Sequence, residues 1–351
     1  MIKPSTYTLE WITGLRTKLG KKVDPKMIEK VINALVLLEQ LRINNLDLIF
    51  KGGTSLLLTA KSPKRFSIDI DIITNHTEKE ITAVLDKIIG NGLFTRWESD
   101  NDRKTAIEAP VTHYKLYYVS KIDTNYGEEP ILLDVLHAPN PYPKVIDYPI
   151  EHEWLESEGE ITLVKIPVYD CILGDKLTAF APKTTGILYS KERPVEIIKQ
   201  LYDLSFLFDQ IESLSLLKLS YLHVVAEELR FRKLSLTHQE VLDDTIEACF
   251  VIANRKPNDV EFKHLHRGII NITNFIIDRF KIEEAIVAAG KIAYLCLILK
   301  NEEEIVIEKF KSPDQIKELI IANPEFNWLN KLKKSTPEAF FYWEKAIALK
   351  N

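Results

Sequence analysis

Residues 48–73 read LIFKGGTSLLLTAKSPKRFSIDIDII, and this stretch decides the fold of the N-terminal half. Its apolar start predicts a short buried strand over residues 46–50, which is followed by two glycines at 52–53. Residues 54–60 predict a helix and residues 67–73 a second strand. Glycine at such a junction lets the backbone approach a ligand closely, and the N–H groups at a helix N-terminus attract anions such as phosphate. The stretch therefore predicts a phosphate-facing turn between two strands.

The second of these strands carries two acids, Asp69 and Asp71, separated by one isoleucine. Side chains two residues apart leave the same face of a strand, so the two carboxylates lie side by side. Adjacent carboxylates repel one another, and holding them together without a counter-ion is costly. A divalent cation removes this cost, and oxygen-only ligands suit Mg²⁺ or Mn²⁺. A third acid, Asp134, is the only acid within the apolar strand ILLDVLHA and is the candidate to complete the metal site or to act as a base.

The composition is that of an ordinary globular protein. The 351 residues are 46% hydrophobic and 28% charged, and no apolar run approaches the ~18 residues that span a bilayer. The three cysteines are few and widely spaced, and the N-terminus lacks a secretory pattern. We therefore expect a cytoplasmic protein with no membrane partner. The net charge of −5 argues against a protein that coats nucleic acid by charge alone.

The pattern of the chain changes near residue 170. Before it, residues 25–45 and 77–90 predict helices, and three further strands are predicted over residues 111–120, 130–137 and 161–167. After it, helical spacing predominates, over residues 168–181, 193–208, 216–232, 238–254, 259–280, 282–301 and 312–321. We predict an α+β protein with a mixed-sheet domain over residues 1–170 and an all-helical domain over residues 171–351 that contributes to the active cleft.

A glycine pair at a helix start, Asp-x-Asp on one strand and an acid on a later strand resemble the nucleotidyltransferase superfamily that includes polymerase beta. The stretches KGGTSL, KRFSIDID, GDKLTAF and KQLYDLSFL resemble more closely the AbiEii/AbiGii-type nucleotidyltransferase toxins, which include the mycobacterial MenT toxins. This resemblance covers residues ~45–210. One departure is the pair Lys199-Gln200, where the family has Arg-Asp.

The resemblance assigns roles to particular residues. It places nucleotide binding on Gly52, Gly53, Thr54, Arg65, Ser67 and Lys176, the metal pair on Asp69 and Asp71, and further catalytic groups on Asp134, Lys176 and Asp203. Lys176 also stands out without the resemblance, because it lies in the otherwise apolar stretch VYDCILGDKLTAFA. An ammonium beside so much apolar surface needs a partner, for which a triphosphate and the neighbouring Asp175 are the alternatives. Asp203 lies in a later helix, where it could position Lys176 or a substrate.

The resemblance implies an Mg²⁺- or Mn²⁺-dependent enzyme that moves a nucleoside monophosphate from an NTP to an acceptor. It further implies that the acceptor is the 3′ end of tRNA and that the protein is the toxin of a toxin–antitoxin system active in phage defence. An antitoxin encoded nearby would be its partner, with or without direct binding. Three alternatives stay open: a small-molecule nucleotidyltransferase of the antibiotic-modifying kind, a protein nucleotidyltransferase, and a degenerate fold that acts only as a binding module.

Overall fold

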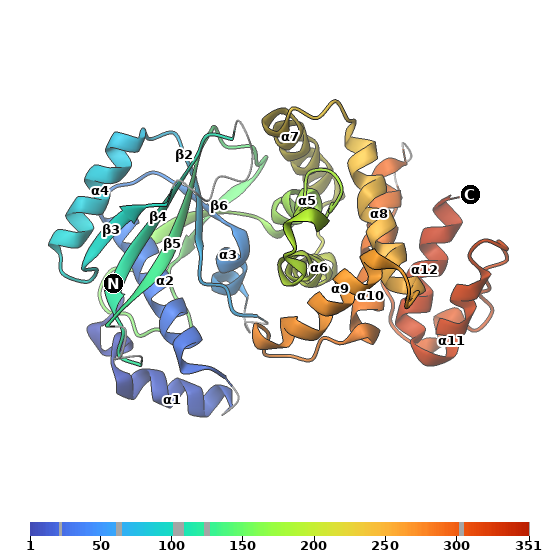
Figure 1. The fold of residues 1–351 in the computed structure, drawn as a ribbon, viewed down its shortest axis with the longest axis horizontal. Helices are drawn as coiled ribbons and strands as arrows, with labels where there is room; N and C mark the ends of the chain where they lie inside the picture. Colours follow the sequence, from blue (N-terminus) through green and yellow to red (C-terminus); the bar gives the residue numbers. More distant parts are fainter. Residues whose placement is uncertain (21–22, 61–64, 101–108, 123–126, 302–304, 351) are drawn as a thin grey trace. The chain divides into compact units, whose positions relative to one another are not determined.

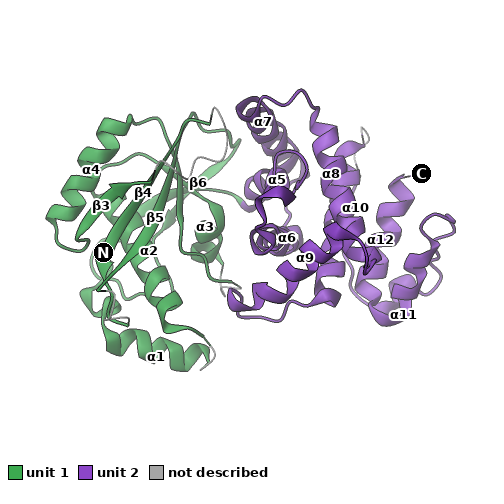
Figure 2. Cartoon of the chain, viewed as in Figure 1, with its two compact units in different colours: residues 1–168 green, residues 169–351 purple. Residues whose placement is uncertain are grey.

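The computed structural model of the chain is shown in Figure 1. It describes residues 1–20, 23–60, 65–100, 109–122, 127–301 and 305–350. The chain divides into two compact units, residues 1–168 and residues 169–351, which Figure 2 colours green and purple.

The first unit is built on a seven-stranded mixed sheet in the order β3-β4-β5-β2-β1-β7-β6. Its strands are β1 Ile49–Lys51, β2 Ile70–Thr74, β3 Arg96–Ser99, β4 Val111–Val119, β5 Glu128–His137, β6 Val145–Pro149 and β7 Leu163–Pro167. Strands β1 and β7 pair in parallel, as do β2 and β5, and the other neighbours are antiparallel. The predicted mixed sheet is therefore confirmed.

Helices α2 and α4 begin at caps that the sequence encodes. The described helices of this unit are η1 Pro4–Tyr7, α1 Leu9–Leu19, α2 Pro25–Ile43, α3 Gly52–Thr59 and α4 Glu78–Gly90. Asp24 caps α2 by accepting a hydrogen bond from the backbone N–H of Lys26, and Thr77 and Glu80 form a capping box at the start of α4.

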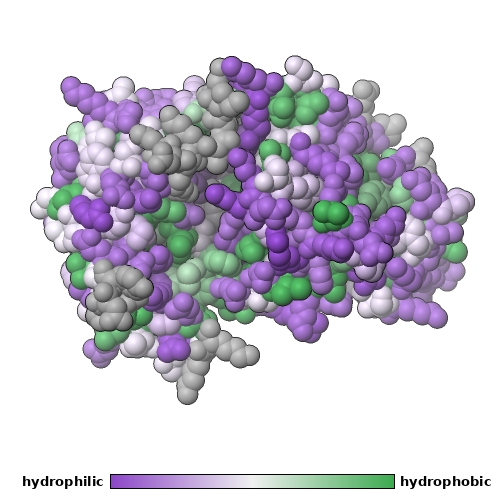
Figure 3. Space-filling view, viewed as in Figure 1, coloured by the Kyte–Doolittle hydropathy of each residue, from purple (hydrophilic) through white to green (hydrophobic). Residues whose placement is uncertain are grey.

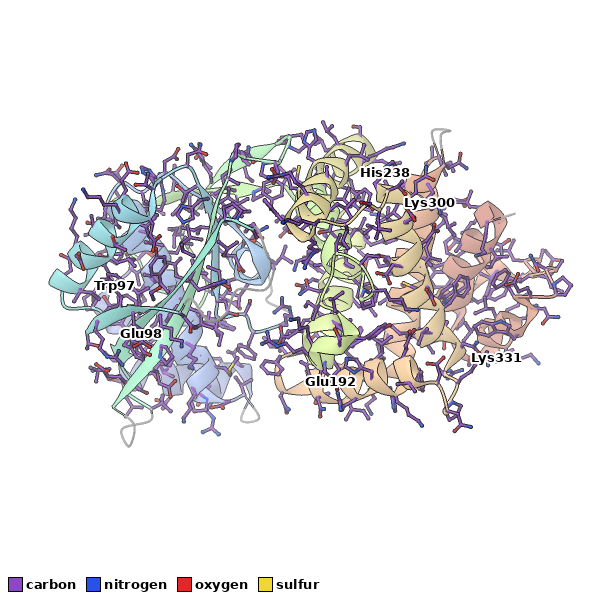
Figure 4. The ribbon with its side chains drawn as sticks, turned by 45° about the horizontal axis from the view of Figure 1, so that its top comes forward. Trp97, Glu98, Glu192, His238, Lys300 and Lys331 are labelled. Carbon is purple, nitrogen blue, oxygen red and sulfur yellow. The ribbon has the colours of Figure 1, made fainter. Side chains whose placement is uncertain are left out.

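Trp97 of β3, labelled in Figure 4, donates a 2.8 Å hydrogen bond from Nε1 to Asp86 of α4. This bond ties α4 to the edge of the sheet.

Four elements of this unit were not predicted from the sequence: η1, α1, β3 and β6. Strands β3 and β6 form the two edges of the sheet, so their side chains are half-buried or exposed and lack a clear apolar alternation. Several predicted bounds also shift, and strand β1 covers Ile49–Lys51 rather than residues 46–50. Helix α3 begins at Gly52 rather than at residue 54, and β2 begins at Ile70, one residue after Asp69.

The second unit is helical, as predicted. Its helices are α5 Tyr169–Ala179, η3 Tyr189–Lys191, α6 Pro194–Asp209, α7 Leu214–Arg232, α8 His238–Asn254, α9 Val260–Asn271, η4 Ile272–Asn274, α10 Ile282–Lys300, η5 Pro313–Ile316, η6 Asn327–Lys331, α11 Leu332–Ser335 and α12 Pro337–Lys350. Figure 1 shows α8 and α10 side by side, and α10 also contacts α6 and α12. The predicted helix over residues 312–321 is wrong, because only the short 3₁₀ turn η5 forms there.

The core of this unit surrounds α10. The aromatic run at residues 340–343 of α12 is fully buried, and Cys171, Cys249 and Cys296 are buried free thiols, as their apolar surroundings predicted. On the face shown in Figure 3, hydrophobic residues are scattered among hydrophilic ones. Along the described parts of the chain, no helix is long and apolar enough to cross a membrane.

Candidate active site

The glycine turn lies directly against the predicted site residues. Gly52 adopts φ +80°, a conformation that L side chains rarely adopt, and a Cβ added there would lie 2.1 Å from Oδ2 of Asp71. A Cβ added at Gly53 would lie 2.3 Å from Nη2 of Arg65 and 2.6 Å from Oγ of Ser67. The backbone conformation of Gly52 favours glycine, and a side chain at either position would displace the carboxylate, the guanidinium or the hydroxyl that now fills the space.

The strand register places four polar residues in one row across the sheet. Lys51 of β1 pairs with Asp71 of β2, Asp71 pairs with Asp134 of β5, and Asp134 pairs with His113 of β4. Register partners on neighbouring strands project from the same face, with backbones about 4.8 Å apart. The structure thus brings together Asp71 and Asp134, which are 63 positions apart in the sequence. Both are half-buried.

Asp134 is held by a histidine that was not singled out in the sequence. Nδ1 of His113 lies 2.8 Å from Oδ1 of Asp134, and only 6% of His113 is exposed. Lys51 is the other member of the row that was missed. The sequence predicts a strand that contains His113 and another that ends one residue before Lys51, but only the register shows that both residues lie in line with the acids.

The remaining predicted residues of this unit frame the turn. Thr54 is fully buried, and its Oγ1 donates a 2.6 Å hydrogen bond to the carbonyl oxygen of Asp69, which ties the first turn of α3 to the residue preceding β2. Arg65 is buried, and its Nη1 donates to the carbonyl oxygen of Phe66 at 3.1 Å. The observed contact of Thr54 is thus with the backbone, and Arg65 and Ser67 lie over Gly53.

The donor chemistry of the row fits a divalent cation. Asp71 and Asp134 supply carboxylate oxygens from adjacent strands, and Oδ2 of Asp71 lies against the backbone of Gly52. Among the described residues, no three His, Cys, Asp or Glu side chains are gathered closely enough to form a ready metal cluster. Asp71 and Asp134 suit Mg²⁺ or Mn²⁺ by type and by their placement on neighbouring strands, but the structure does not gather Asp69 with them into a cluster of three.

The two predicted residues of the second unit form a buried ion pair. Nζ of Lys176 on α5 lies 2.8 Å from Oδ2 of Asp203 on α6, and the two residues are 6% and 4% exposed. Lys176 also donates a 3.1 Å hydrogen bond to Oε1 of Gln200, the residue at which the sequence departs from the family pattern. The structure thus shows Asp203, on the next helix, as the charged partner of Lys176, where the sequence had left Asp175 as an alternative.

A mixed sheet with a carboxylate pair beside a glycine turn at a helix start is the arrangement of nucleotidyltransferase enzymes. The family described as nucleotidyl transferase AbiEii toxin, type IV toxin–antitoxin system, matches residues 36–265, about two thirds of the chain. The chain belongs to this family, and the predicted membership is confirmed. It is a nucleotidyltransferase, and the family implies an NTP as substrate and an antitoxin as partner.

Two further comparisons add little. Among solved structures, an antigenic nucleotidyltransferase-like protein from Paracoccidioides brasiliensis is similar, with 13% identity and a TM-score of 0.37. The match covers 58% of this chain and 89% of that one, and the likeness is too weak to support an argument. Comparison with curated proteins gives no match.

Proposed function

We propose that this nucleotidyltransferase moves a nucleoside monophosphate from an NTP to the 3′ end of tRNA in a reaction that depends on Mg²⁺ or Mn²⁺. The observation that carries the proposal is the register of Asp71 with Asp134, beside a turn in which Gly52 has a conformation that other residues rarely adopt. A bound cation would neutralise the triphosphate and activate the attacking oxygen. Asp69, Asp71 and Asp134 would hold it.

The chain's own groups bind and orient the triphosphate. The N–H groups at the start of α3 lack partners within the helix and attract phosphate oxygens. The Arg65 guanidinium and the Ser67 hydroxyl, which lie where a side chain of Gly53 would be, supply charge and a hydrogen bond to the same phosphates. Thr54 keeps this turn in place through its bond to the Asp69 carbonyl.

The proposed transfer needs no reactant other than the NTP and the acceptor. The hydroxyl oxygen of the acceptor bonds to the α-phosphorus of the NTP, the α–β phosphoanhydride bond breaks, and pyrophosphate leaves. The hydroxyl proton passes to a carboxylate of the row. Asp134 is the candidate, because His113 is hydrogen-bonded to it and because it lies beside Asp71 on the neighbouring strand.

The tRNA acceptor rests on family membership. Members of a toxin family must act on a component that growth requires, and blocking the 3′ end of tRNA would stop translation. The net charge of −5 means that affinity for RNA has to come from a local basic surface. Lys176 and Asp203 are proposed to serve the same transfer, Lys176 toward phosphate and Asp203 by positioning it. The three buried free thiols suit the reducing cytoplasm.

Incubating the full chain with each labelled NTP, Mg²⁺ or Mn²⁺, and purified tRNA, total RNA or total protein tests the proposal. Label at the tRNA 3′ end that is lost in Asp71→Asn supports it. The matched control is Asp147→Asn, which changes an exposed acid on the edge strand β6 of the same sheet and should leave labelling unchanged. Label only in protein, only in a small molecule such as an aminoglycoside, or in nothing would overturn it.

A further inference from the structure

His113 contacts Asp134, one of the acids proposed to hold the cation. It is a buried imidazole on β4 whose Nδ1 lies 2.8 Å from Oδ1 of Asp134, its register partner on β5. On the other side of Asp134, the register partner is Asp71. Asp134 therefore lies between a second carboxylate and a buried hydrogen-bonding ring.

The direction of this hydrogen bond follows from the chemistry of the two groups. An ionised carboxylate can only accept, so the proton lies on Nδ1 of His113 and the ring donates. An aspartate side chain on a strand samples several rotamers, and a donor fixed in the core restricts it to those in which Oδ1 meets the ring. Residues that hydrogen-bond to a metal ligand fix the orientation of that ligand and so affect the affinity for the metal.

We propose that His113 is a positioning residue that holds the Asp134 carboxylate in the orientation that binds the divalent cation. This inference rests on the proposed function. It predicts that binding of the cation depends on the N–H donor of residue 113 and not only on the volume of the ring. A purely structural histidine would affect folding stability alone.

Two substitutions separate the donor from the volume. His113→Phe keeps a buried ring and removes the N–H, whereas His113→Asn loses volume and keeps an amide N–H close to the position of Nδ1. The matched control is His137→Phe on β5. His137 is also hydrogen-bonded within this unit, but its two nitrogens meet the carbonyl oxygen of His76 and Oγ1 of Thr112, both at 2.8 Å.

The test titrates each full-length variant with Mn²⁺ alone, followed by electron paramagnetic resonance, and then measures kcat and KM for transfer. We expect His113→Phe to weaken Mn²⁺ binding by about 10- to 100-fold. His113→Asn should recover most of this loss, and His137→Phe should bind Mn²⁺ like the wild type. Thermal unfolding of each variant shows that it is folded. Adding His113→Phe to Asp134→Asn should cost less than about twofold more, because the two residues act as a unit.

The inference is overturned if His113→Phe binds Mn²⁺ as the wild type does, or if His113→Asn fails to recover binding. These outcomes differ from a failure of the proposed function. If Asp71→Asn transfers nucleotide and binds Mn²⁺ like the wild type, the metal site itself is wrong, and the inference falls with it. If Asp71→Asn is inactive while His113→Phe is normal, only the role of His113 fails.

Discussion

The two units of this protein place charged residues in their interiors in opposite ways. In the first unit, Asp71 and Asp134 lie side by side on neighbouring strands, so like charges are brought together in a half-buried row. In the second, Lys176 and Asp203 are almost fully buried, and opposite charges meet at 2.8 Å. The row brings together carboxylates that repel one another, whereas the pair neutralises itself.

This difference indicates which arrangement is open to a ligand. Two carboxylates in register repel one another, and this repulsion favours the binding of a cation beside them. A buried ion pair is already satisfied, and its members are hard to separate because an unpaired charge would be left in the interior. Changes to the row should therefore affect function first, and changes to the pair should affect stability first.

The largest expected effect is on transfer by the row. Asp71→Asn keeps the size of the side chain and removes its charge, so the fold should survive. Because metal binding contributes several kcal/mol to such reactions, we expect the rate to fall by about 10³-fold or more. Single-turnover labelling, with the NTP and acceptor that the labelling experiment identifies, measures the rate, and circular dichroism checks the fold. A variant that retains more than a tenth of the activity would show that the row is not the metal site.

The next effect is on the stability of the pair. Lys176→Ala leaves Asp203 buried without its partner and should lower the free energy of unfolding by about 3–5 kcal/mol. The double variant Lys176→Met with Asp203→Leu removes both charges and should recover most of that loss. Urea unfolding measures both. We expect the stable double variant to lack transfer activity, and full activity in it would show that the pair is only structural.

His152 is a third titratable group, half-buried, and loss of hydration is the only cause of the shift in its pKa. Burial lowers the pKa of His152 to about 4, below its usual 6.5. The folded state therefore binds the proton less readily than the unfolded state. The stabilisation is complete above pH 6.5 and is lost as the pH falls toward 4, by about 3 kcal/mol in all.

His152→Asn tests this, because asparagine does not titrate. Its side-chain oxygen can still accept a hydrogen bond from the backbone N–H of Trp154, which in the wild type donates to Nδ1 of His152 at 3.2 Å. Urea unfolding of both proteins between pH 7 and pH 4 should show the wild type losing its advantage over the variant as the pH falls. A constant difference across this range would contradict the assignment.

The smallest effect compares two glycines with the same backbone strain. Gly52 and Gly92 have φ +80° and +77°, but only Gly52 has neighbours that a Cβ would meet. Alanine at either position should destabilise the protein by about 1–2 kcal/mol. Only Gly52→Ala should also reduce transfer, because its Cβ would push the Asp71 carboxylate aside. Equal activity in the two variants would show that Asp71 tolerates the shift.

Much of this protein could be predicted from local sequence. Asp71 alternates with isoleucines and Asp134 interrupts an apolar strand, so periodicity located the strands that carry these two acids, whereas Asp69 lies one residue before β2. The caps of α2 and α4 and the helical spacing after residue 170 are likewise local signals. The edge strands β3 and β6 escaped prediction because an edge strand buries too little to show alternation.

The sequence by itself determined the elements, the glycine turn and the identity of the acids, because these depend on residues that are close together in the chain. Only the tertiary structure decided which residues meet. Strand register aligned Asp71 with Asp134 and placed His113 beside Asp134. Helix packing gave Lys176 the partner Asp203 rather than Asp175, its neighbour in the sequence. Such pairings join residues far apart in the sequence, and they arise only when the buried faces of sheet and helices pack together.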